Sequence, residues 1–291
     1  MGESTSTQPA PGDDAVSTPT ATVPTATSTG IGACGQSGSL TLLLIGADVL
    51  GGSLPNGADA IRIVKVNFDN QTVKIVTIPR DLLIQTASVN DASMVTQKIG
   101  LTFHEAYTAS TGTSIEKNAI GARVVAQLLL NSFNLQSDHY LTIQMDQFVK
   151  MIDTIGGVEI NIPAAVTTDR NISYSAGLQT LNGALASEYI RFLNPGGEEG
   201  RTARQNAFIQ ALQDKVINIG ILAHLPTLIT QFKDALITDL SIEQLTSLAC
   251  LSVNMNKSNI TFGAITAPDL MVDNMPNIEK IKLYLTTFLG D

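Results

Sequence analysis

Short apolar runs alternate with helix-like patterns along most of this chain, and the alternation predicts a mixed α/β fold. The run SLTLLLIGAD over 39–48 is apolar almost to its end, as expected for a strand that is buried on both faces. Two β-branched stretches, 59–68 and 72–78, flank the turn signal Asp69-Asn70 and predict a β-hairpin. Further strands are predicted over 139–145, 158–163 and 259–265. Helical periodicity and terminal signals predict helices over 115–132, 146–156, 181–192, 201–219, 222–236, 241–252 and 277–288.

The N-terminal part of the chain differs from the rest in composition. Thr, Ser, Pro, Ala and Gly occupy 23 of the first 30 positions, so this segment cannot bury enough apolar surface to offset its ordering entropy. We expect 1–37 to be a disordered tether and 38–291 to be one α/β or α+β domain. Such a tether belongs either to a cytoplasmic protein or behind a membrane anchor that precedes this chain. The second reading is favoured, because a cytoplasmic protein has little use for a tether.

Charge and hydropathy exclude several classes of protein. The 291 residues carry 17 basic and 26 acidic side chains, a net charge of −9, so general nucleic-acid binding is not expected. No run of 18 or more apolar residues occurs, and therefore no segment of this chain is expected to span a membrane. The three histidines, His104, His139 and His224, lie too far apart in sequence to suggest a zinc site.

Two other sequence features do not indicate a nucleotide-binding or metal site. The stretch 30–35 matches the dinucleotide pattern G-x-G-x-x-G, but the tether precedes it where a strand is required, so it reads as a linker. The two cysteines, Cys34 and Cys250, fit no metal motif, and the sequence leaves open whether they form a disulfide.

Charged side chains are scarce, only 15% of residues, and three groups of them fall at the ends of predicted elements. Loops at strand ends are common positions for functional sites. Clustered arginines suit a phosphate or pyrophosphate, and two nearby carboxylates suit Mg²⁺ shared with that phosphate. The competing interpretation is a set of surface ion pairs, Arg80 with Asp81 and Arg201 with Glu198 or Glu199. The groups are Asp48 with Asp59, Arg80 with Asp81, and Arg191 with Arg201 and Arg204.

The order of these segments resembles the LytR-CpsA-Psr family, also labelled the cell envelope-related transcriptional attenuator domain. The matching segments run in family order and cover about 38–270, and IPRD, D-x-[IV]-G-G-V and R-x-x-R-Q together are specific. They are LLLIGAD (42–48), ADAIRIVKV (58–66), TIPRDLLI (77–84), Lys98-Ile99, DHYLTIQMDQFVKMIDTIGGVEINIP (138–163), LNGALASEYIRF (181–192) and GRTARQNAFIQAL (200–212).

The resemblance implies a fold and an activity. The fold would be a single-domain α/β/α sandwich with a central mixed β-sheet and a hydrophobic pocket for a polyprenyl lipid. The activity would be Mg²⁺-assisted transfer of a phosphate-linked glycan from a polyprenyl (pyro)phosphate carrier to peptidoglycan. Relatives lie outside the cytoplasmic membrane on an N-terminal anchor, and nucleic-acid binding is not expected for this acidic chain.

Residue roles are implied in the same way. Asp48 and Asp59 match metal-associated aspartates, and Arg80, Asp81 and Arg201 match the catalytic group. The residues that match phosphate contacts, or that orient them, are Arg80, Arg191, Arg201, Arg204 and Gln205.

The chain departs from the family pattern where the family usually has arginines. Val49-Leu50 follow the first aspartate, Gly57-Ala58 precede the second, and Leu193 stands two residues after Arg191. Each missing charge-assisted bond weakens anion binding by roughly 1.5–3 kcal/mol. The alternative function is therefore a protein that binds polyprenyl phosphate or wall polymer without catalysis.

Overall fold

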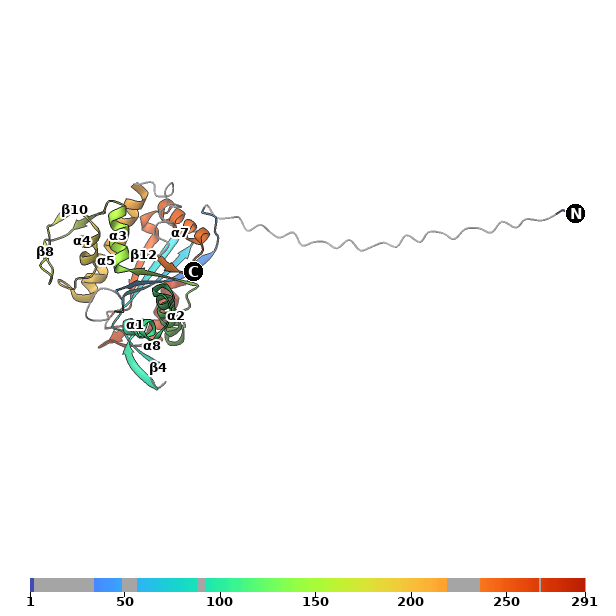
Figure 1. The fold of residues 1–291 in the computed structure, drawn as a ribbon, viewed down its shortest axis with the longest axis horizontal. Coiled ribbons are helices and arrows are strands. Elements are labelled where there is room, and N and C mark those ends of the chain that lie inside the picture. The colour runs from blue at the N-terminus through green and yellow to red at the C-terminus, as the bar shows by residue number, and fades with distance from the viewer. Residues whose placement is uncertain (3–33, 49–56, 88–92, 219–235, 267, 291) are drawn as a thin grey trace. The chain divides into compact units, whose positions relative to one another are not determined.

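The predicted hairpin lies at the centre of a six-stranded sheet (Figure 1). The computed structural model describes residues 1–2, 34–48, 57–87, 93–218, 236–266 and 268–290. Most of the expected tether, the loop over 49–56 and nearly all of the expected helix over 222–236 lie outside the described residues. The boundary at residue 37 therefore stays a prediction.

The central sheet is mixed, with the strand order β11-β6-β1-β2-β3-β12. Neighbouring strands are antiparallel except for the β1–β6 and β3–β12 pairs, which are parallel. The strands are β1 (Ser39–Ala47), β2 (Ala58–Asn67), β3 (Thr72–Ile78), β6 (His139–Gln144), β11 (Leu236–Thr238) and β12 (Ile260–Ala264). Two-stranded pairs are β4 (Leu83–Ala87) with β5 (Met94–Lys98), β7 (Val158–Ile162) with β10 (Gly177–Leu181), β8 (Val166–Thr167) with β9 (Ser173–Tyr174), and β13 (Met271–Val272) with β14 (Met275–Pro276).

Helices cover both faces of this sheet, and the expected α/β/α sandwich is confirmed. Figure 1 shows α1, α2 and α8 on one side of the sheet and α7 on the other. The helices are α1 (Ile99–Ala109), α2 (Ser114–Phe133), α3 (Met145–Thr154), α4 (Gly183–Tyr189), α5 (Gly197–Asn218), α7 (Ile242–Asn254) and α8 (Ile278–Leu289), with a 3₁₀ turn at Lys257–Asn259.

Strand β1 explains why its sequence is apolar without alternation. Leu43 and Ile45 belong to the core shared with α1, α2 and α8, whereas Leu40 and Leu42 belong to the core shared with α7. Successive side chains of a strand point to opposite faces, so both sets of alternate positions are buried here. The fully apolar run therefore reports a central strand.

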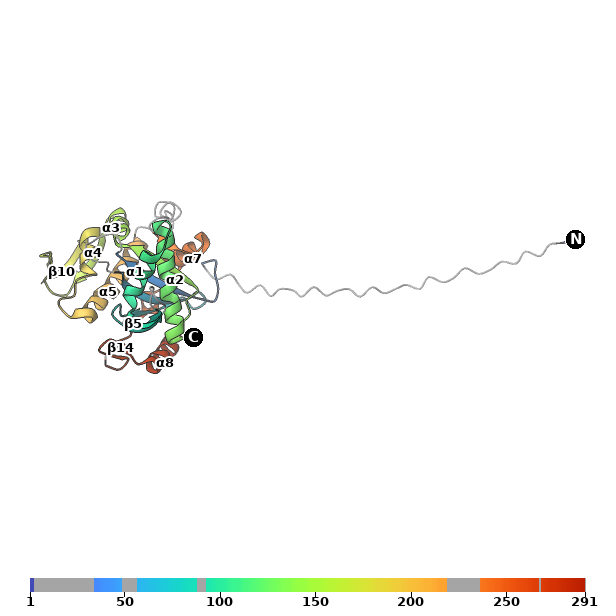
Figure 2. The same ribbon diagram turned by 60° about the horizontal axis from the view of Figure 1, so that its bottom comes forward.

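A third apolar core lies outside the main sheet and supports the functional segments. It is formed by α3, α4, the first half of α5 and the β7–β10 pair, with Phe148 and Phe208 in ring contact at 5.6 Å between centroids. Figure 2 shows α3, α4 and α5 gathered at one end of the domain, away from α8. This core anchors the segment between α4 and α5.

Several expected boundaries shift for local reasons. The stretch over 181–192 is not one helix, because Leu181 still belongs to β10 and Asn182 caps α4 by accepting from the Leu185 N–H at 2.9 Å. Helix α5 begins at Gly197, four residues before the expected start. The β4–β5 hairpin and α1 have weak sequence patterns and were not expected.

Cys34 and Cys250 form a disulfide, which settles the question that the sequence left open. It joins the segment before β1 to α7 across 216 positions of sequence. In the described part of the chain no helix is both long and apolar enough to cross a bilayer.

Candidate anion-binding site

The site lies at the end of the central sheet where β1 and β3 finish and β2 begins. Ala47 pairs with Ala58, so Asp48 and Asp59 follow neighbouring positions on two strands. Ile61 pairs with Ile78, which brings the chain after β3 beside the start of β2. This register places Arg80 Nη1 at 2.6 Å from Asp59 Oδ1.

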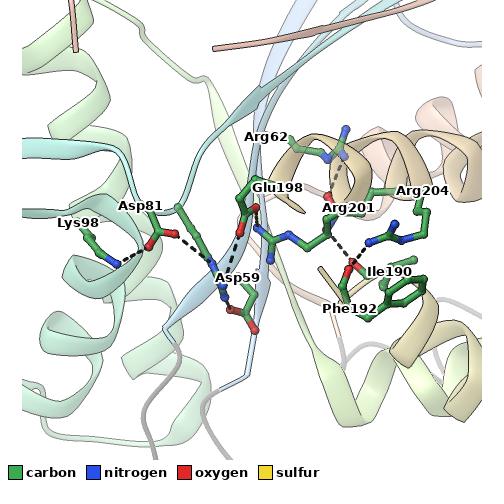
Figure 3. Close-up of polar contacts among 11 residues, drawn as sticks. Asp59, Arg62, Asp81, Lys98, Ile190, Phe192, Glu198, Arg201 and Arg204 are labelled. Atoms are coloured by element: carbon green, nitrogen blue, oxygen red, sulfur yellow. Dashed lines mark hydrogen bonds and ion pairs between the residues drawn. The ribbon is translucent and has the colours of Figure 1, made fainter. Parts of the chain in front are cut away.

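Arg80 is surrounded by carboxylates on three sides. Besides Asp59, its guanidinium lies 3.6 Å from Glu198 and 4.0 Å from Asp81, and Asp81 is itself held by Lys98 at 2.8 Å (Figure 3). Burial alone lowers the pKa of Arg80, but the surrounding carboxylates outweigh this effect and raise the pKa overall. Arg80 therefore stays charged, and its buried Nε has no acceptor among the described residues.

Arg201 is brought to the same place by the first turns of α5. Its Nη2 lies 2.5 Å from Glu198, three residues earlier on the helix, so one carboxylate bridges Arg80 and Arg201. The Arg201 residue is only 6% exposed. Burial lowers its pKa, partly offset by Glu198, and its buried Nε also lacks an acceptor among the described residues. Two cationic donors are thus left for a ligand.

Arg191 joins the site just beyond the end of α4. Its Nη2 lies 3.1 Å from Asp48 Oδ2, and both side chains are largely buried. Its main-chain N–H donates to the carbonyl of Glu188, which keeps the segment turned toward the sheet.

Arg204 and Gln205 both hold the segment after α4, and Gln205 also lines the apolar and sheet-edge cavities. The Arg204 guanidinium donates to the carbonyls of Tyr189, Phe192 and Pro195, and lies 3.7 Å from the centroid of the Phe192 ring. Gln205 donates to the carbonyl of Ile190 at 3.0 Å. These contacts fix the segment that carries Arg191, and direct contact of either side chain with a phosphate stays a prediction.

Arg62 was not among the residues that the sequence singled out. It lies on β2, is 3% exposed, and donates to Gln205 and Asn206 of α5. The signal available in the sequence was an arginine inside the run AIRIVKV, at a position that strand alternation assigns to a covered face.

Three cavities meet at Asp59 and Arg201, which line all of them. The apolar cavity, about 200 Å³, lies between β1, β2, α3 and α5 and is lined chiefly by residues such as Leu44, Phe148 and Phe208. The polar cavity, about 230 Å³, contains Arg80, Asp169, Arg170, Glu188 and Arg191. The sheet-edge cavity, about 430 Å³, extends from Asp81 and Glu198 along β2 and β3 toward Met271.

The two aspartates fit a shared Mg²⁺ unequally. Among the described residues, no group of three or more metal-binding side chains converges on one point. Mg²⁺ commonly takes one or two carboxylates and completes its shell with water and substrate phosphate oxygens. Asp59 suits that role because its carboxylate faces all three cavities, whereas Asp48 pairs with Arg191 and is not among the described lining residues.

The predicted site residues are thus brought together by the fold. Asp48, Asp59, Arg80, Asp81, Arg191 and Arg201 all lie around one sheet edge. An α/β/α sandwich with buried arginines between polar and apolar cavities is the class that fold and site define. The chain belongs to the LytR_cpsA_psr family, whose model matches residues 12–285.

Two curated relatives support the assignment to this family. The chain is 23% identical over 249 residues to the polyisoprenyl-teichoic acid–peptidoglycan teichoic acid transferase TagV of Bacillus subtilis, covering 80% of this chain and 60% of TagV. It is 25% identical over 224 residues to the cell wall biosynthesis protein LcpA of Corynebacterium glutamicum, covering 72% of this chain and 43% of LcpA.

The fold is also found in a solved structure. The crystal structure of B. subtilis TagV superimposes with a TM-score of 0.67 at 23% identity, over 87% of this chain and 98% of that one. The chain spans 60% or less of the length of the curated relatives described here.

Proposed function

We propose that this protein transfers a phosphate-linked glycopolymer from a polyprenyl (pyro)phosphate carrier to peptidoglycan. The observation that carries the proposal is a pair of arginines, the half-buried Arg80 and the buried Arg201, whose buried Nε donors have no acceptor among the described residues. Arg201 lines all three cavities, and Arg80 lines the polar one. The family, and the transferase name of TagV, support the same chemistry.

The apolar cavity is our candidate for the start of the lipid tail. Its volume of about 200 Å³ is below the roughly 300–1,000 Å³ of typical small-molecule sites. It would therefore take the isoprene units nearest the phosphate and leave the rest of the tail outside. A phosphate at its arginine end would lie beside Arg191 and Arg201.

Transfer would proceed by displacement at phosphorus. A peptidoglycan hydroxyl forms a new O–P bond with the glycan-bearing phosphorus, the bond from that phosphorus to the carrier phosphate oxygen breaks, and the hydroxyl proton is lost. Arg80, Arg191 and Arg201 would hold the phosphates and stabilise the charge that develops on their oxygens. Asp59 would hold Mg²⁺, which would supply further charge neutralisation.

The disulfide supports a location outside the cytoplasm. Structural disulfides persist in oxidising compartments and are rare in the cytosol. Cys34–Cys250 therefore fits an extracytoplasmic domain, where peptidoglycan and a lipid-linked donor meet. We propose that a membrane anchor before this chain holds it there, with residues 1–37 as the tether.

The test is glycan transfer from a synthetic polyprenyl-pyrophosphate-linked oligosaccharide to peptidoglycan fragments. We expect Arg80→Ala to lower the transfer rate by about 10²–10³-fold, because it removes a buried donor to the developing charge. Arg123→Ala is the matched control, since Arg123 is exposed on α2.

Two results would count against catalysis. Unchanged transfer in Arg80→Ala removes that residue from the mechanism. Wild-type protein that binds the carrier lipid but forms no product in the presence of Mg²⁺ supports the alternative of a non-catalytic lipid-binding protein.

A further inference from the structure

Arg62 carries a buried charge that the described protein does not neutralise. The residue is 3% exposed, and its side chain contacts α5. Nη1 lies 2.7 Å from Asn206 Oδ1, and Nη2 lies 2.9 Å from Gln205 Oε1. Both acceptors are neutral amide oxygens. Within the described residues no carboxylate forms an ion pair with Arg62, unlike Arg80, Arg191 and Arg201.

This arrangement is unfavourable in the unliganded protein. A buried guanidinium loses its hydration, and amide oxygens compensate less well than a carboxylate. Burial, together with repulsion from Arg201, lowers the pKa of Arg62 to about 10, so it is still protonated at neutral pH. The fold therefore keeps a positive charge at a position where an apolar side chain would be more stable.

The place of that charge is specific. Of the three cavities at the site, Arg62 lines only the apolar one. The charged side chains of that cavity are Arg62, Arg191, Arg201 and one carboxylate, Asp59, which is already engaged with Arg80. An apolar cavity with excess positive charge at one end matches an anion attached to an apolar tail.

We propose that Arg62 is a ligand-binding residue of the apolar cavity, where it and Arg201 receive the phosphate nearest the tail of an isoprenoid lipid. The inference rests on the proposed function, and it adds a residue and a chemical class of ligand to that site. Gln205 and Asn206 hold the guanidinium in place before the ligand arrives. The bound phosphate then supplies the missing negative charge.

Two variants separate charge from shape. Arg62→Gln keeps hydrogen-bond donors but removes the charge, and Arg62→Met keeps an apolar stem of similar length. Arg123→Gln, at an exposed position of α2, is the control for loss of a cation elsewhere. Three probes separate the parts of the ligand: farnesyl phosphate carries tail and anion, farnesol carries the tail alone, and inorganic phosphate carries the anion alone.

We expect wild-type protein to bind farnesyl phosphate at least about tenfold more tightly than farnesol, and inorganic phosphate only weakly, since one charge-assisted contact corresponds to about that factor. In Arg62→Gln and Arg62→Met the preference should fall about tenfold below that of the wild type, because one of the two charge-assisted contacts is lost, whereas Arg123→Gln keeps it. Binding is measured well below the unfolding temperature of each variant, so a change in stability does not decide the result.

The inference is overturned if both Arg62 variants keep the wild-type preference for farnesyl phosphate. It is also overturned if wild-type protein shows no such preference. Transfer assays distinguish the two proposals: transfer with an unchanged preference in the variants leaves the proposed function standing alone. Loss of the preference without any transfer by the wild type leaves this lipid-phosphate site standing alone.

Discussion

Asp59 is the residue on which the site depends most directly. It pairs with Arg80 at 2.6 Å and lines all three cavities, so any phosphate placed between Arg80 and Arg201 lies beside its carboxylate. Two negative groups in one place repel each other unless a cation is shared between them. The same residue thus holds Arg80 in the unliganded protein and, under the proposed function, would share a Mg²⁺ ion with the bound phosphate.

This arrangement predicts that Asp59→Asn changes the metal dependence of transfer. Wild-type transfer should rise with Mg²⁺, whereas Asp59→Asn should be slower at saturating Mg²⁺ and insensitive to its removal by a chelator. The measurement is the transfer rate against Mg²⁺ concentration. Asp146→Asn is the control, because Asp146 lies on α3 and, among the residues that the structure describes, pairs only with its own helix neighbours Gln147 and Lys150. A wild type that transfers equally well without metal contradicts this role.

The sequence pointed to Asp59, Arg80 and Arg201, and to the local ion pairs of Arg80 with Asp81 and of Arg201 with Glu198, both of which the structure shows. It did not point to the pairing of Arg80 with Asp59 or with Glu198. Asp59, Arg80 and Arg201 each lie in a segment that matches the family, and each follows a recognisable element end. That Glu198 bridges the two arginines depends on where α5 begins and how it meets the sheet. The sequence did not predict a role for Arg62 for the same reason, since its partners are 143 and 144 positions away.

At the scale of elements, the polar residues of α5 have two roles. The spacing of Glu198, Arg201 and Gln205 keeps them on one helical face, toward the sheet and the cavities. Arg204 turns instead to the segment after α4, where it holds three carbonyls. Helix position alone therefore separates the anion-facing arginine from the one that fixes a loop.

The contact between α3 and α4 sets where Arg191 lies. Gly183, at the start of α4, donates its N–H to Asp153 at 2.7 Å, and an added Cβ would overlap the Val149 carbonyl. Gly183→Ala should lower the free energy of unfolding by about 1–3 kcal/mol, as overpacking does. It should also slow transfer, because α4 must shift and Arg191 with it.

Chemical denaturation and the transfer assay check this prediction together. Ala184→Ser is the control, since Ala184 is exposed on the same helix and tolerates an extra atom. Stability equal to wild type in Gly183→Ala would show that α3 and α4 can separate without cost, and that this contact does not position Arg191.

At the scale of the whole domain, the disulfide closes a covalent loop that spans 216 positions of sequence. Cys34 precedes the first strand and Cys250 lies in α7, so the bond ties α7 to the face of the sheet that it covers. Removing a native disulfide leaves the contacts of the folded state in place but increases the conformational entropy of the unfolded chain. The free energy of unfolding typically falls by about 2–4 kcal/mol as a result.

We therefore expect the Cys34→Ser, Cys250→Ser double variant to unfold at lower denaturant, with a free energy about 2–4 kcal/mol below that of the wild type. Reductant should bring the wild type to the level of the double variant and leave the double variant unchanged. Wild-type stability that is insensitive to full reduction of the disulfide would contradict the prediction.

Local pattern was enough to predict β1, β2, β3, β6, β7 and β12, most helices and the family, but not the β4–β5 hairpin or α1. Alternation, β-branched runs and caps act over a few residues, and family motifs are read directly from the letters. The tertiary structure alone decided that Cys34 pairs with Cys250, that Arg62 contacts α5 with no carboxylate partner in the described part of the chain, and that three cavities meet at Asp59. Those features join residues up to 216 positions apart, and such pairings depend on how the layers pack rather than on any local signal.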